Sequence, residues 1–407
     1  MQQGRCMWNS AEVVVTDTNI NRRQFLGGAL GVAAGAGALA ACGSPDSGSG
    51  GTSTSPSSAP STSRPPIASE PGKMSLLEWA GYEAAGTKAQ TAGMTVAGSD
   101  YTKKYGPDSV TYTYIENDDQ ALQKATASGG FDVMHPCFEN FQDYVDRDLV
   151  QPWDLNLIPS AADIDPGLLA KGTKDGKTYM LPWDWGYGSL TYRTDHVDAA
   201  DATGWELAWN PKYAGRVSLW GGASTNFEIA AIKNGIQDMD HLTADQLETC
   251  KQDLIKQKPL NKFYWDSEYG QMQPAIKSGT VWIAYSWQDT LVSMKSAGVP
   301  VAYLDPSQGR IAWFCGFMLG KDTQNYYHAH EYVESFLNKA ACAQMTNAYA
   351  YGTSNAKVTS ADITDKALAT SLHIDDLAAL TSPSVHLQSW NPDRAKVLAA
   401  WQQVKAS

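Results

Sequence analysis

The stretch VTYTYIENDDQALQKATASGGFDVM, residues 110–134, decides the fold class. Residues 110–115 are β-branched and aromatic and predict a strand, and residues 131–134 predict a second, buried strand. Between them, residues 118–127 predict a helix with an aspartate at its N-cap. A strand followed by a helix and another strand indicates a mostly parallel sheet with helices on both faces.

This alternation continues from residue 74 to the end of the chain. Further strands are predicted at 74–79, 188–192, 216–219, 281–285, 301–304 and 311–319, and further helices at 140–147, 226–234, 243–257, 325–337, 339–349 and 392–406. No internal repeat or second linker interrupts the series, so two lobes are predicted to be interleaved along the chain. Ligands of such sheets bind at the carboxyl ends of strands, which makes loops 79–83, 135–139 and 181–186 candidate binding segments.

Composition excludes several classes of function. The chain has 407 residues, which predicts two or three domains, and a net charge of −12, which disfavours nucleic acid as a partner. There are 14 Trp and 19 Tyr against 9 Phe, an excess of aromatic residues with a polar end that is typical of ligand pockets and interfaces. No P-loop, G-x-S-x-G, H-E-x-x-H or C-x-x-C motif occurs.

The N-terminal region predicts export and anchoring. Residues 21–26, NRRQFL, form a twin-arginine pattern, and the apolar run at 27–41 is too short to span a bilayer. It ends in LAACG, which resembles a lipobox with Cys42 as the lipidated residue. We therefore expect a signal peptide at 1–41, a disordered Ser/Gly/Pro tether at 42–73, and lipid anchoring at the outer face of the bacterial cytoplasmic membrane, at the cell surface or in the periplasm.

Six segments of the folded part, in this order and spacing, resemble the spermidine/putrescine-type solute-binding proteins of ABC importers. They are FDV with Pro136 at 131–136, LVQP at 149–152, LPWDWG at 181–186, WNPKYAGRV at 209–217, IAWF at 311–314 and YAYGTSN at 349–355. Residues 181–186 look like that family's turn before a hinge strand. The resemblance extends from about residue 74 to residue 405.

The resemblance implies an α/β architecture, the type II periplasmic-binding-protein fold, with two lobes that close over a solute. Lobe one is expected to comprise 74–185 plus 313–355, and lobe two 186–312 plus 356–407. It also implies a monomer that partners an importer permease, with no catalytic residue, no cofactor and no metal.

The family's pocket positions carry over one at a time. Trp79 and Tyr82 match an aromatic pair after the first strand, and Trp287 and Trp313 match two pocket tryptophans. Tyr351 matches a late tyrosine. Such rings suit a cation held between their faces. Gln388 matches a polar contact near the C-terminus.

The departures from the family pattern concern charge. The two acidic positions after strand 216–219 are Gly222 and Thr225, and a third is Cys315. An ammonium group buried without a counter-charge costs several kcal/mol, so other carboxylates must substitute or the ligand is not a polyamine. The predicted ligand-binding residues, with the substitutes Glu139, Asp184 and Asp289 included, are Trp79, Tyr82, Cys137, Glu139, Asp184, Trp185, Thr225, Trp287, Asp289, Trp313, Cys315, Tyr351 and Gln388.

Several alternatives remain open from the sequence. Cys137, at a serine position of the family, can form a disulfide with Cys315, and two buried thiols or a soft-metal site are the alternatives. The solute can be polyamine-like, a quaternary ammonium, a guanidino compound or a neutral amphiphile, and a sensor role is a further possibility. An enzyme using Cys137 with His135 as base is disfavoured, because residues two apart on one strand end are poorly placed to share a proton.

Overall fold

The computed structural model describes residues 66–79, 82, 98–115, 117–128, 130–265, 271–382 and 385–407. The predicted signal peptide, Cys42 and the tether up to residue 65 lie outside these residues. Residues 63–407 form one compact unit. None of the helices in the described part of the chain combines the length and the apolar character that crossing a bilayer requires.

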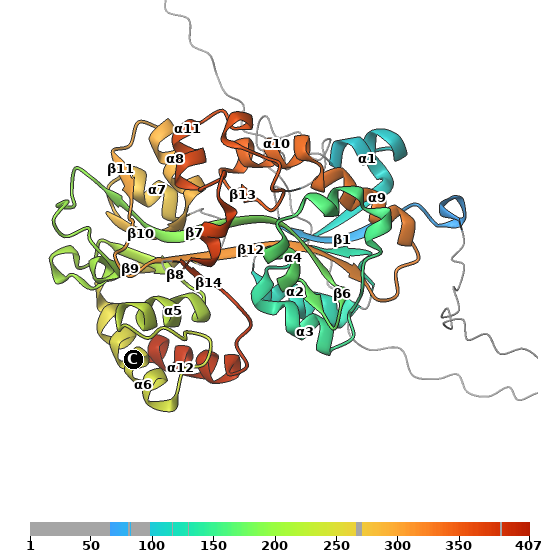
Figure 1. Cartoon of the computed structure of the whole chain (residues 1–407). Helices are drawn as coiled ribbons and strands as arrows, with labels where there is room; N and C mark the ends of the chain where they lie inside the picture. The colour runs from blue at the N-terminus through green and yellow to red at the C-terminus, as the bar shows by residue number, and fades with distance from the viewer. Residues whose placement is uncertain are drawn as a thin grey trace, which may run out of the picture. The chain divides into compact units, whose positions relative to one another are not determined.

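One twisted sheet organises the folded unit (Figure 1). Its main path runs, in spatial order, through β2 (Val110–Ile115), β1 (Met74–Trp79), β3 (Val133–Met134), β12 (Arg310–Gly320), β7 (Met180–Arg193), β10 (Ile283–Trp287), β8 (Val217–Trp220) and β9 (Asn261–Trp265). Shorter strands join it: β4 (Val150–Gln151), β11 (Val301–Tyr303), β13 (Gly352–Thr353) and β14 (Val385–Leu387). β5 (Thr173–Lys174) and β6 (Lys177–Thr178) form a separate hairpin.

Along its main path the sheet is parallel only at its two ends, although the short β14 also pairs in parallel with β12. β1 pairs in parallel with β2 and β3, and β8 pairs in parallel with β9 and β10. In the middle, β12 runs antiparallel to both β3 and β7, and β7 runs antiparallel to β10. The prediction of a mostly parallel sheet is therefore wrong for the centre, where two long strands carry the chain from one parallel half to the other.

The segment 181–186 is not a turn. It lies inside β7, a strand of 14 residues whose first 12 are all buried. A strand that is buried on both faces shows no alternation of polar and apolar residues. The segment with Pro182 and Gly186 was therefore not recognised as part of a strand and was predicted as a turn. β12, with 11 residues, pairs along β7 and likewise belongs to both halves of the sheet.

Twelve helices flank the sheet in the described part of the chain. They are α1 (Gly98–Tyr105), α2 (Asp118–Ser128), α3 (Phe141–Asp146), α4 (Pro166–Lys171), α5 (Ala223–Lys233), α6 (Ala244–Gln257), α7 (Met272–Lys277), α8 (Gln288–Ser296), α9 (Tyr326–Leu337), α10 (Lys339–Tyr349), α11 (Lys366–Ser371) and α12 (Arg394–Ala406). α6 begins with a capping box between Thr243 and Gln246, which fixes its start where the sequence predicts it.

Buried side chains gather in three clusters. One combines β8, β10, α5, α6 and α12, and the other two lie against β1, β3 and β12. Val358, Ile363 and Ile374 pack in a cluster with β1, although residues 356–407 were assigned to lobe two. The lobe boundaries as a whole stay a prediction, and these contacts favour moving residues 356–374 to lobe one, while α12 packs with the cluster of β8 and β10.

The end of the predicted tether is held against the folded unit. Ile67–Ser69 form a 3-10 turn, and the Glu70 carboxylate accepts the backbone N–H groups of Tyr327 and His328 at the start of α9. The Gly72 N–H donates to Asn325 Oδ1 at 2.9 Å. The tether was expected to reach residue 73, but its last residues are fixed by contacts with α9.

Candidate functional site

The carboxyl ends of β1 and β3 lie next to each other and bring two predicted site segments together. The register pairs Leu77 with Met134, so Glu78 and His135, the next residue on each strand, are neighbours. Three residues beyond β3, Cys137 forms an isolated bridge with Cys315 in the middle of β12.

Cys137 and Cys315 form a disulfide, which excludes the alternatives of two free thiols and of a soft-metal site at this position. The bond joins residues 178 positions apart in the sequence. Cys315 is 3% exposed, whereas Cys137 is partly exposed, and the Cys137 N–H donates to Asp118 Oδ1 at 2.8 Å. Cys250 and Cys342 are buried free thiols.

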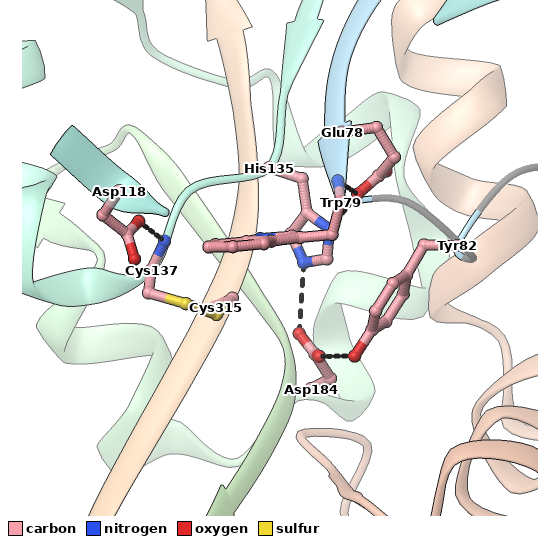
Figure 2. Close-up of a disulfide and its surroundings, with 8 residues drawn as sticks. All are labelled: Glu78, Trp79, Tyr82, Asp118, His135, Cys137, Asp184 and Cys315. Carbon is pink, nitrogen blue, oxygen red and sulfur yellow. Dashed lines mark hydrogen bonds and ion pairs between the residues drawn. A yellow bond between two sulfur atoms is a disulfide. The ribbon is translucent and has the colours of Figure 1, made fainter. Parts of the chain in front are cut away.

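Beside the disulfide lies a buried ionic triad of Glu78, His135 and Asp184 (Figure 2). His135 Nδ1 lies 2.6 Å from Glu78 Oε1, and its Nε2 lies 3.1 Å from Asp184 Oδ1. All three side chains are 1% exposed. Burial alone would lower the pKa of His135, but the charges of Glu78 and Asp184 raise it to about 10, so His135 is an imidazolium that donates from both nitrogens.

The triad holds two predicted aromatic residues. The Tyr82 hydroxyl donates to Asp184 Oδ2 at 2.9 Å, and the backbone N–H of Trp79 donates to Glu78 Oε1 at 2.8 Å (Figure 2). Tyr82 also stacks on Tyr349 with a ring-centroid distance of 4.4 Å. The carboxylates of the triad therefore hold the Tyr82 hydroxyl and the Trp79 backbone in place.

Two predicted ligand contacts are fully enclosed. Both oxygens of Asp184 have hydrogen-bond partners in the triad and Tyr82, so this carboxylate has no surface left for a solute in the structure. Trp185 is 0% exposed, and its indole N–H donates to the Thr353 carbonyl. Their geometry assigns Asp184 to positioning Tyr82 and Trp185 to the core.

A group of aromatic side chains covers two glycines of β7. The Trp313 indole lies over Gly186 so closely that a Cβ there would be 2.7 Å from its Cζ2, and the Tyr285 hydroxyl lies even closer over Gly188. Trp313 meets Tyr351 edge-on at 4.9 Å. Glycine at these two positions is required by the close approach of the rings.

Trp287 lies at the end of β10 and contacts two of the three buried clusters. Its ring meets Trp220 and Trp265 edge-on at 5.4 and 5.3 Å. It is partly exposed, as is Trp79, whereas Trp313 is 9% exposed. Trp287 and Trp313 thus lie on the two strands that flank β7, whereas Trp79 lies at the end of β1.

The remaining predicted residues occupy three separate elements. Thr225 is buried in the first turn of α5, and Asp289 is partly exposed in the first turn of α8. Glu139 follows Cys137 in a 3-10 turn and is 22% exposed. Burial and the nearby Asp118 charge raise the pKa of Glu139 to about 7.

Two charged residues near the site escaped sequence reasoning. Glu228, in α5, is 6% exposed and accepts a hydrogen bond from Gln388 Nε2 at 2.7 Å. Arg394, at the start of α12, pairs with Asp119 at 2.5 Å and lies 3.9 Å from Glu139. In the sequence Glu228 is a carboxylate within an apolar stretch of α5. This pattern could have indicated a buried charge.

Within the residues that the structure describes, no group of three or more His, Cys, Asp and Glu side chains is arranged to hold a metal ion.

The chain is similar to known proteins in both sequence and fold. Residues 77–370 match the model of a family described as bacterial extracellular solute-binding protein. A spermidine/putrescine-binding periplasmic protein of Haemophilus influenzae is 25% identical over 260 residues, which cover 63% of this chain and 71% of that protein.

Two solved structures share the fold. A spermidine/putrescine ABC transporter substrate-binding protein of Streptococcus pneumoniae superposes with a TM-score of 0.64 at 19% identity, covering 82% of this chain and 98% of its own. A binding protein of Agrobacterium tumefaciens in complex with agropinic acid gives a TM-score of 0.62 at 17% identity, with coverages of 82% and 99%.

Proposed function

The chain belongs to the family of bacterial extracellular solute-binding proteins, and from this premise we propose that it binds a small organic cation between two closing lobes and delivers it to the permease of an ABC importer. The observation that carries the cationic assignment is the grouping of tryptophans and buried carboxylates around the crossing strands. The relative named for spermidine and putrescine supports an amine as the solute.

The aromatic group supplies the surface for a cation. Trp79 and Trp287 end β1 and β10, and Trp313 lies within β12. Each good contact between a cation and a ring face contributes about 0.5–2 kcal/mol. Their indole rings also suit a methylene chain between two charged ends. We propose that the solute lies against these rings, with Glu139 and Asp289 as counter-charges and Cys137, Cys315, Thr225, Tyr351 and Gln388 around it.

The route of delivery rests on the N-terminal sequence. We propose that the signal peptide directs export, that Cys42 carries the lipid anchor, and that the protein acts as a monomer on the outer face of the membrane. A binding protein needs no chemical step. Closure of the two lobes about β7 and β12, the long strands that run between them, would enclose the solute. This reading leaves no catalytic role for the His135 and Cys137 pair.

A solute that also carries acceptor oxygens is the second candidate. The indole N–H groups of Trp79 and Trp313 are buried and have no hydrogen-bond acceptor among the described residues. The fold neighbour in complex with agropinic acid shows that this fold accommodates such molecules. A compound with both an ammonium group and hydroxyl or carboxylate oxygens would satisfy the indoles and the carboxylates together.

Replacing Trp287 with leucine tests the aromatic surface. We expect the dissociation constant for spermidine to rise by about 5- to 30-fold, the equivalent of about 1–2 kcal/mol, while Trp287→Phe recovers part of the loss. Isothermal titration calorimetry measures both.

Trp209→Leu is the matched control, because Trp209 is a partly buried tryptophan packed on the cluster of β8 and α6. It should leave the affinity within threefold of the wild type. Equal losses in the Trp209 and Trp287 variants would show that the effect is on stability and would remove Trp287 from the site.

A further inference from the structure

Glu228 is a buried carboxylate that this chain leaves without a cation. Its side chain is 6% exposed and accepts a hydrogen bond from a neutral amide, Gln388 Nε2. Within the part of the chain that the structure describes, Glu228 forms no ion pair with a lysine, arginine or histidine. A buried carboxylate without a counter-charge costs several kcal/mol, and burial raises the pKa of Glu228 well above its usual range.

The position of Glu228 matches a charge that is missing elsewhere. α5 begins at Ala223 after Gly222, and Thr225 and Glu228 are three residues apart, on the same face of this helix. The family's acidic positions are expected at Gly222 and Thr225. The chain therefore places a carboxylate one helical turn beyond the two positions that lack one.

Gln388 ties Glu228 to the aromatic group. The Gln388 N–H donates to the Ala312 carbonyl at 2.8 Å, and Ala312 directly precedes Trp313 on β12. Because the Gln388 side chain holds Glu228 Oε2, the carboxylate lies beside the strand that carries Trp313. Burial, and then the charges of Glu228 and Glu139, raise the pKa of Tyr285, whose hydroxyl covers Gly188.

The charged groups around Glu228 have partners of their own. Arg394 pairs with Asp119 at 2.5 Å and lies 3.9 Å from Glu139, and Asp240 accepts a hydrogen bond from the Ser389 hydroxyl. Arg394, whose charge favours the ionised form of Glu228, is thus paired with Asp119 and lies close to Glu139. Glu228, Glu139 and Asp240 repel one another, which further favours a cation brought in from outside.

We propose that Glu228 is the counter-charge for the cationic group of the solute, a primary ammonium or guanidinium, and that Gln388 is the positioning residue that holds its carboxylate. The proposal rests on the proposed function. It accounts for the absence of carboxylates at Gly222, Thr225 and Cys315, because Glu228, further along α5, supplies the negative charge instead. Burial raises the pKa of Glu228, and a bound cation would lower it again.

The test is Glu228→Gln in the full chain, with spermidine as the probe. This substitution keeps the shape and a hydrogen-bonding partner for Gln388 but removes the charge. We expect the spermidine dissociation constant to rise at least 30-fold while the ligand-free protein stays as stable as the wild type or becomes more stable. Glu228→Asp should restore part of the affinity. Asp240→Asn, which alters a nearby, partly exposed carboxylate, should change it less than threefold.

A second readout separates charge from structure. Titration of the wild type in two buffers of different ionisation enthalpy should show release of protons on binding at pH 6.5, and the release should fall in Glu228→Gln. If the wild type binds spermidine and Glu228→Gln binds it within threefold, Glu228 is not the counter-charge and the proposed function stands. If the wild type binds no amine at all, the proposed function and this inference are both wrong.

Discussion

Replacing His135 with glutamine is expected to lower the free energy of unfolding by about 3–5 kcal/mol at pH 6.5. The substitution leaves Glu78 and Asp184 buried at 1% exposure without the imidazolium between them. Removing one partner of a buried ionic group typically costs this much, because the remaining charges stay desolvated and repel each other. Urea unfolding followed by circular dichroism measures the difference.

The pH dependence identifies the cause. The folded pKa of His135, about 10, lies above its unfolded value of about 6.5. The stability it contributes is therefore fully present below pH 6.5 and is lost as pH rises toward 10, by up to about 1.4 kcal/mol per pH unit. The difference in stability between wild type and His135→Gln should shrink across this window.

His328→Gln is the matched control. His328 is a buried histidine whose ring nitrogen lies 2.7 Å from the Tyr101 hydroxyl and not between two carboxylates. Its stability loss should not follow the same pH profile. A loss in His135→Gln that is below 1 kcal/mol, or constant between pH 6.5 and 10, would contradict the ionic triad.

Removing the Cys137–Cys315 disulfide should also cost about 3–5 kcal/mol. The bond closes a loop spanning 178 residues of sequence, and the entropy that a cross-link removes from the unfolded chain grows with loop length. The double variant Cys137→Ala, Cys315→Ala, studied by urea unfolding, gives the cost.

Cys250→Ala serves as the control, because Cys250 is a buried free thiol in α6. It should cost no more than the loss of a small buried side chain. Thiol titration of the unfolded protein should find two more thiols after reduction than before. Four free thiols at 137, 250, 315 and 342 before reduction would show that the disulfide does not form.

Local patterns predicted most of the elements. The helix expected at 118–127 is α2, and the strand expected at 110–115 is β2, because their periodicity or β-branched composition is unbroken. Missed were β9, α8, the short helices α1, α4, α7 and α11, and the short strands β4, β5, β6, β13 and β14. α8 starts directly after Trp287 with no turn residue between strand and helix, so no signal marks its start. β7 was misread because burial on both faces removes alternation.

Only part of the candidate site could be predicted from the sequence. The aromatic residues at strand ends could be named because their motifs carry the resemblance. The triad could not, since it needs the register of β1 against β3 and the approach of Asp184 from β7, which are properties of the folded sheet. In the structure the Asp184 carboxylate bonds to His135 and Tyr82, and its contact with a solute stays a prediction. Glu228 was overlooked although it is a carboxylate within an apolar stretch of α5.

The most direct test of the account is titration of spermidine into the full chain after unfolding and refolding to remove any bound solute. The account predicts saturable binding of one spermidine per chain, competition by putrescine, and none by a neutral sugar. At 100 times the dissociation constant, spermidine should add about 2.7 kcal/mol to the stability. Binding of a neutral or anionic solute with no response to any amine would contradict the claim that the site is built for a cation.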